Sequence, residues 1–68
     1  MTDKLTVFVT VDTIENARQI ANVVVKRHLA ACCTIVPKVT SIFYWEGELK
    51  EEAEHLLIMK TRKQVFGL

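Results

Sequence analysis

The sequence predicts a single α+β domain, and three observations along the chain support that prediction. Residues 5–11 are rich in β-branched and aromatic side chains, which is typical of a strand. Between residues 13 and 29 apolar side chains recur at helical spacing, and two long β-rich segments, 32–45 and 48–61, follow on either side of a short turn. An order of strand, helix, strand and strand, continued by the start of a second helix in residues 62–68, is typical of a split βαβ plait, the ferredoxin-like fold.

The first helix is expected to run from Thr13 to Leu29. Either Asp12 or Thr13 can cap its N-terminus, and Glu15 follows Asp12 at the spacing of a capping box. The basic run at residues 26–28 suits the negative end of the helix dipole. One apolar stripe covers one face of this helix and consists of Ala17, Ile20, Ala21, Val24, Val25 and Leu29.

The two β-rich segments form a predicted hairpin that turns at Glu46-Gly47. Each arm has room for about 12 to 14 extended residues, or roughly 40 Å, whereas a compact chain of this length has a radius of gyration of about 11 Å. Residues 56–59 place apolar side chains on both faces of the second arm. Because one small domain cannot cover that surface, we expect other copies of the chain to cover it. Pro37 is expected to mark a bulge or bend in the first arm.

Composition points to a soluble cytoplasmic protein without a nucleic-acid partner. Nine basic residues are offset by eight acidic ones, and no apolar stretch approaches the length of a membrane span. No signal peptide is visible at the N-terminus. A second helix and a closing strand would complete the plait, so residues 1–68 are expected to be one domain that is incomplete at its C-terminus.

Four segments taken together are specific enough to suggest a family. They are Arg27-His28-Leu29-Ala30-Ala31-Cys32, Ile35-Val36-Pro37, Thr40-Ser41-Ile42-Phe43-Tyr44-Trp45-Glu46-Gly47 and Leu57-Ile58-Met59-Lys60-Thr61-Arg62. In this combination they resemble the CutA family, the divalent-cation tolerance proteins. The resemblance implies a ferredoxin-like subunit, a homotrimer built through long intersubunit hairpins, and a link to tolerance of copper and other divalent cations. The chain departs from the family pattern by ending before a second helix and a His-Pro-Tyr-Glu-like segment.

Cys32 is the first candidate metal ligand, because thiolates bind Cu(I) strongly. The alternative is a small buried apolar residue, which is how a free cysteine usually behaves. Its neighbour Cys33 points to the opposite face of a strand, so the pair is poorly placed to hold one ion or to form a relaxed disulfide. His28 precedes Cys32 by four residues but is better explained as a cation at the helix end, and His55 is expected to be a solvated strand histidine facing Lys38.

Five glutamates lie in and after the hairpin turn, and they are a second candidate for a metal site. Carboxylate clusters can hold hard divalent cations, but charges at a hairpin tip also protect an exposed edge from aggregation. Adjacent glutamates on a strand point to opposite faces, so the protective role is favoured. The five residues are Glu46, Glu48, Glu51, Glu52 and Glu54.

Tyr44, Trp45 and Glu46 at the turn, together with Lys60, resemble the intersubunit cleft residues of the CutA family. An aromatic ring, a carboxylate and an ammonium group can bind a small polar ligand there. Trp45 can equally be a packing anchor in a trimer interface, where aromatic residues are enriched. No phosphate-binding loop, HExxH motif or nucleophile elbow is present, so neither an enzymatic activity nor an organic cofactor is expected.

The preferred functional hypothesis is therefore a homotrimeric CutA-like protein that binds copper or another divalent cation weakly and acts in metal tolerance. The alternative is a trimeric signalling or scaffold module that binds a small metabolite or a protein partner at its intersubunit clefts. A structural trimer without a specific ligand is the third hypothesis.

Overall fold

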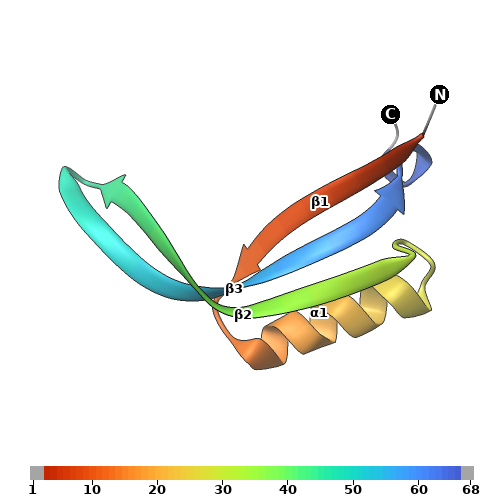
Figure 1. Cartoon of the computed structure of the whole chain (residues 1–68), viewed down its shortest axis with the longest axis horizontal. Coiled ribbons are helices and arrows are strands. Elements are labelled where there is room, and N and C mark those ends of the chain that lie inside the picture. The colour runs from red at the N-terminus through yellow and green to blue at the C-terminus, as the bar shows by residue number, and fades with distance from the viewer. Residues whose placement is uncertain (1–2, 67–68) are drawn as a thin grey trace.

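A computed structural model describes residues 3–66 of the chain. The elements follow the predicted order, with a three-stranded antiparallel sheet arranged β1-β3-β2 and one helix (Figure 1). They are β1 (Lys4–Val11), α1 (Ile14–Lys26), β2 (Cys32–Trp45), β3 (Glu48–Arg62) and a 3₁₀ turn, η1 (Lys63–Phe66). The predicted start of a second helix corresponds to η1, and the end of that predicted segment, residues 67 and 68, lies outside the described residues.

Thr13 caps the N-terminus of α1. Its backbone is extended, and its hydroxyl oxygen accepts a hydrogen bond of 3.1 Å from the backbone N–H of Asn16. The Asp12 carboxylate instead accepts a bond of 3.1 Å from the Asn16 side-chain amide. The predicted capping box between Asp12 and Glu15 was therefore wrong, because Thr13 occupies the cap and Asn16 stands three residues after it.

The helix ends at Lys26, three residues before the predicted end at Leu29. His28 has a φ of 59°, in the left-handed region. The N–H of His28 donates to the carbonyl of Val25 at 3.1 Å, and the N–H of Leu29 donates to the carbonyl of Val24 at 2.8 Å. These two bonds form a Schellman motif, which satisfies the last carbonyls and turns the chain toward β2.

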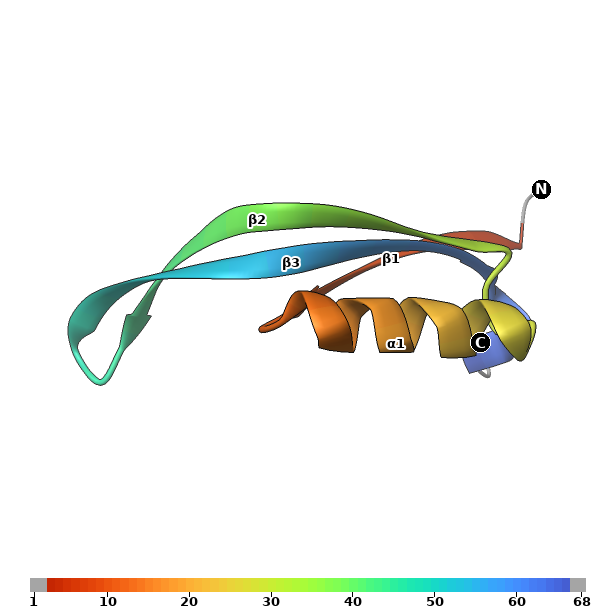
Figure 2. The ribbon, with the colours of Figure 1, turned by 90° about the horizontal axis from the view of Figure 1, so that it is seen from below.

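Helix α1 covers one face of the sheet, as Figure 2 shows. It packs mainly against β2 and less against β3 and β1. The core between them is small: Leu57 and Ala17 are fully buried and Ala30 is nearly so. An apolar groove of about 250 Å³ remains on the β1 side, lined among others by Val7, Val9, Val24, Met59 and Val65.

The other face of the sheet has no covering layer within the described residues. We call it the open face. In the middle of this face Ile58 lies between Phe8 on β1 and Thr34 on β2. Phe8 is 64% exposed, which is unusual for so large an apolar side chain.

Strands β2 and β3 continue beyond the other elements as a projecting arm, which we define as residues 39–54. The two central residues of its turn, Glu46 and Gly47, have φ angles of 52° and 79°, as a two-residue type I′ turn requires. Trp45 pairs with Glu48, as predicted. Both strands are long, with 14 residues in β2 and 15 in β3.

A bulge separates the arm from the rest of the sheet. The register of β2 against β3 shifts between Val36 and Val39, so the predicted irregularity at Pro37 is confirmed. Lys38 has a φ of 59°, and its N–H donates to Nδ1 of His55 at 3.3 Å. In Figure 1 the sheet bends at this point, and the arm leaves at an angle to the remainder of the sheet.

The arm gives the molecule an elongated shape. Its radius of gyration is 14.1 Å, whereas about 11 Å is expected of a compact chain of this length. Its longest extent is 41 Å. Among residues 3–66, no helix has the length and apolar character that a membrane crossing requires.

Candidate functional site

The two adjacent cysteines lie on opposite faces of β2, as predicted. Cys32 is exposed on the open face and pairs with Lys60 of β3. Cys33 is half-buried toward α1, and this loss of hydration, with a smaller contribution from neighbouring Cys32, raises the pKa of its thiol above the ordinary value. Both thiols are free. Cys32 is therefore the accessible thiol, and a lysine is its cross-strand neighbour.

The two histidines have structural roles in this chain. The backbone of His28 closes the Schellman motif after α1, and the imidazole of His55 accepts the bond from the bulge at Lys38. Across residues 3–66, no three side chains of the His, Cys, Asp and Glu types come together in a group that could hold a metal ion. A metal site with three such ligands that includes Cys32 therefore needs ligands from outside the described part of one chain.

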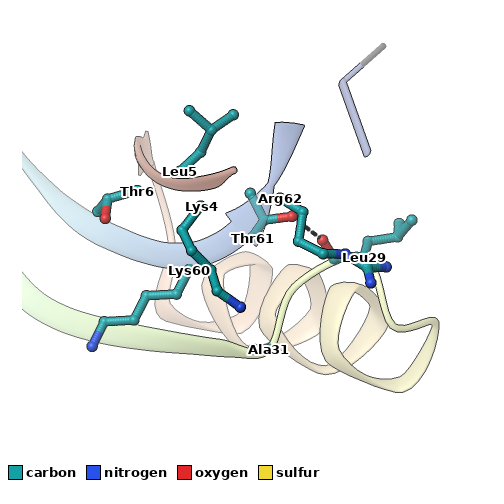
Figure 3. Close-up of a pocket in the computed structure, with 8 residues that line it drawn as sticks. All are labelled: Lys4, Leu5, Thr6, Leu29, Ala31, Lys60, Thr61 and Arg62. Carbon is teal, nitrogen blue, oxygen red and sulfur yellow. Dashed lines mark hydrogen bonds between the residues drawn. The ribbon is translucent and has the colours of Figure 1, made fainter. Parts of the chain in front are cut away.

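A pocket of about 390 Å³ lies at the end of the sheet opposite the arm (Figure 3). Its walls are the ends of β1 and β3 and the segment between α1 and β2, and its lining residues are Lys4, Leu5, Thr6, Leu29, Ala31, Lys60, Thr61 and Arg62. Thr61 is 6% exposed, and its hydroxyl donates a hydrogen bond to the carbonyl of Leu29. The N–H of Ala31 donates to the carbonyl of Lys60 at 2.8 Å. These two bonds fix the wall of the pocket.

The predicted cleft residues lie at both ends of the molecule. Tyr44, Trp45 and Glu46 are at the tip of the arm, and Lys60 lines the pocket at the opposite end. Along β3 the twelve steps from Glu48, the partner of Trp45, to Lys60 span roughly 40 Å. Within one chain these residues do not meet.

The aromatic residues of the arm also point in different directions. Tyr44 and Trp45 are neighbours on a strand and so face opposite sides of the arm. They are 76% and 62% exposed. Large exposed aromatic side chains are typical of surfaces that contact another molecule.

Arg62 and Lys4 are pocket residues that the sequence analysis did not single out. Arg62 lies two residues after Lys60 on β3 and therefore shares the open face with it. Lys4 pairs with Arg62 across the strands and lies on the same face. The signal for Arg62 was available, since residues two apart on a strand share a face. The signal for Lys4 depended on the register between β1 and β3, which the sequence alone did not reveal.

The fold defines the chain as a ferredoxin-like subunit, because the β-α-β-β order and the β1-β3-β2 sheet are those of the first part of a split βαβ plait. A family model described as CutA1 divalent ion tolerance protein matches residues 5–67. The chain therefore belongs to the CutA family.

Sequence and structure comparisons agree with this assignment. Protein CutA, chloroplastic, of Arabidopsis thaliana is 43% identical over 62 residues, which cover 91% of this chain and 34% of that protein. The solved structure of the divalent cation tolerance protein (Cut A1) from Thermus thermophilus matches with a TM-score of 0.88 and 46% identity. That match covers 93% of this chain and 61% of the other, so the chain spans less than two thirds of the relatives it resembles.

A third relative carries a ligand according to its description. The structure of CutA from Synechococcus elongatus PCC7942 complexed with a Bis-Tris molecule matches with a TM-score of 0.87 and 30% identity. The match covers 97% of this chain and 60% of that chain.

Proposed function

We propose that this chain is a subunit of a cytoplasmic homotrimer that acts in divalent-cation tolerance by binding copper or a similar cation weakly. The observation that carries the proposal is the combination of an open sheet face with a projecting arm. Phe8 on the open face and Tyr44 on the arm are 64% and 76% exposed. Contacts with further copies would remove this apolar surface from water. The proposal assigns no catalytic step to the chain.

The cation role rests on family membership and on Cys32. Cys32 is exposed on the open face, where copies of the chain would meet. Thiolates from more than one copy could then share an ion that a single chain, over its described residues, has no ligand set to hold. The ammonium group of Lys60 on the neighbouring strand opposes a bound cation, so the proposed binding is weak.

Native mass spectrometry with and without one equivalent of copper per chain tests this proposal. We expect a trimer that retains copper, and we expect Cys32→Ser to keep the trimer and lose the metal. Cys33→Ser is the matched control, because Cys33 faces α1 and its replacement should leave copper retention unchanged. A trimer that retains copper equally well without the Cys32 thiol would contradict the assigned ligand, and a monomeric wild type would contradict the assembly.

A second candidate function is binding of a small polar molecule in a cleft between copies. Tyr44, Trp45 and Glu46 of one copy and Lys60 of another would form that cleft, since one chain holds them at opposite ends. The Bis-Tris complex of the Synechococcus relative supports the idea that this family accepts such molecules. In a thermal-shift screen, stabilisation by small organic compounds but not by copper or zinc would favour this function.

A further inference from the structure

The projecting arm joins the rest of the sheet at a bulge that faces a single residue of β3. The pairing of β2 with β3 is interrupted between Val36 and Val39. The two residues in this gap, Pro37 and Lys38, stand opposite His55 alone, which is the arrangement of a β-bulge. Beyond the bulge the arm leaves at an angle to the remainder of the sheet (Figure 1). The bulge is therefore the place where the direction of the arm is set.

One hydrogen bond ties the bulge to β3. Because proline has no N–H, the N–H of Lys38 is the only backbone donor of the bulge. It donates to Nδ1 of the half-buried His55 at 3.3 Å. Lys38 has a φ of 59°, a left-handed conformation that is unfavourable for a residue with a side chain. The imidazole of His55 thus holds a conformation that the backbone alone disfavours.

The imidazole can accept this bond only while Nδ1 carries no proton. In that state the ring is neutral and its proton lies on Nε2. When the ring takes up a second proton, both nitrogens become donors, so the N–H of Lys38 faces another N–H and the bond is lost. Histidine is the side chain that ordinarily changes its charge between pH 8 and pH 5. The bond is therefore present at the upper end of this range and lost toward the lower end.

The surroundings of His55 leave this bond as the main contact that a proton would change. On β3 the residues that share its face, Ala53 and Leu57, are uncharged, and Glu54 points to the other face. Its partner on β1 is Val11. The charged residues of the adjoining segments are exposed, and they are Lys38 in the bulge, Asp12 after β1 and Glu15 in the first turn of α1. Salt screens charges in such exposed positions, so loss of the hydrogen bond dominates the response to pH.

We propose that His55 is a pH-sensitive switch that fixes the direction of the projecting arm. In its neutral form the imidazole holds the bulge at Lys38, and the arm keeps one orientation relative to the body of the molecule. Protonation removes the bond, and the arm, with its exposed Tyr44 and Trp45, is then free to change direction. The switch requires neither a bound metal ion nor a second copy of the chain, so its failure would leave the proposed function untouched.

Nuclear magnetic resonance of the whole chain at pH 8 and at pH 5 tests the switch. The ring nitrogen shifts of His55 identify its protonated nitrogen, and the hydrogen-exchange protection factor of the Lys38 amide reports its bond. Residual dipolar couplings of residues 39–54 report the direction of the arm. His55→Gln removes the titrating ring, and His28→Asn is the matched control, because it removes the other histidine while asparagine tolerates the positive φ there. Circular dichroism checks that each variant is folded at both pH values.

At pH 8 we expect the proton of the His55 ring on Nε2. At pH 5 the protection factor of the Lys38 amide should be about fivefold lower, and the couplings of the arm should shrink relative to those of the body. His28→Asn should respond as the wild type does, and His55→Gln should not respond. A proton on Nδ1 at pH 8, a constant protection factor in the wild type, or an equal fall in His55→Gln would overturn the switch. If the protection factor falls while the couplings of the arm stay unchanged, the bond does not direct the arm and the proposal is wrong.

Discussion

The same two strands serve different purposes in the body of the molecule and in the projecting arm. In the body Leu57 is fully buried beneath α1, and Thr61 is tied by its hydroxyl to the segment after the helix. In the arm Trp45 is 62% exposed and Leu49 is 63% exposed. The body is stabilised by contacts within the chain, whereas these apolar side chains of the arm remain largely exposed in a single chain. A substitution should therefore affect folding in the body and assembly in the arm.

Leu57→Ala should have the largest effect on the free energy of unfolding. It removes the largest fully buried side chain of the core, and such truncations cost about 2–5 kcal/mol. Leu49→Ala is the matched control, because the same truncation in the arm creates no cavity within the chain. Denaturant unfolding of both variants at one protein concentration measures the difference. Equal losses in the two variants would contradict the division between body and arm.

Thr61→Val should have the next largest effect on the free energy of unfolding. It keeps the shape of the side chain but removes the hydrogen bond from the buried Thr61 side chain to the carbonyl of Leu29, a partly buried bond whose loss costs about 1 kcal/mol. Thr40→Val makes the same change at an exposed position of the arm and should stay within about 0.5 kcal/mol of the wild type. Unfolding curves of the two variants, measured side by side, make the comparison. A loss of stability in Thr61→Val alone shows that the hydrogen bond of Thr61 is stabilising, whereas equal losses would show that replacing threonine by valine is destabilising at either position.

Substitutions in the turn of the arm test the contribution of its backbone conformation to stability. Gly47→Ala should destabilise by about 1 kcal/mol, because its φ of 79° disfavours a side chain although no atom lies within 4 Å of the added Cβ. Glu46→Asn should have the opposite sign, because asparagine adopts a positive φ more readily at the first turn position. If the free energy of unfolding changes in the same direction in both variants, the backbone conformation of the turn does not explain their effects.

The hairpin could be predicted from the sequence because local chemistry determines it. The Glu46-Gly47 turn set the pairing of Trp45 with Glu48, and Pro37 marked the bulge. The helix end could not be predicted in the same way. The apolar stripe continues to Leu29, whereas the helix is ended by a left-handed backbone at His28, a conformation usually signalled by glycine.

The faces on which the two cysteines lie could be predicted from the sequence, whereas the arrangement of the candidate residues could not. Alternation along β2 correctly separated Cys32 from Cys33. The distance between the arm residues and Lys60 depends on how far the strands extend in one direction, and the proposed cleft depends on contacts between copies. Neither the distance nor the cleft can be predicted from the local sequence pattern.

The smallest predicted effect concerns the pH dependence of folding in the body. Burial raises the pKa of the Cys33 thiol above its ordinary value of 9.0, so the unfolded chain releases this proton at a lower pH than the folded chain. Above that ordinary value the folded state binds more protons than the unfolded state, and the free energy of unfolding falls as the pH rises through the folded pKa. In Cys33→Ala the free energy of unfolding should fall less at alkaline pH than in the wild type, because the contribution of this thiol is gone.

Cys32→Ala is the control, since its exposed thiol should leave the component due to Cys33 in place. Denaturant unfolding at a series of pH values, at one protein concentration, compares the two variants with the wild type. A decline that is unchanged in Cys33→Ala but reduced in Cys32→Ala would show that the outward thiol carries the linkage. It would contradict the assignment of Cys33 to the covered face, and with it the reason for choosing Cys32 as the accessible ligand.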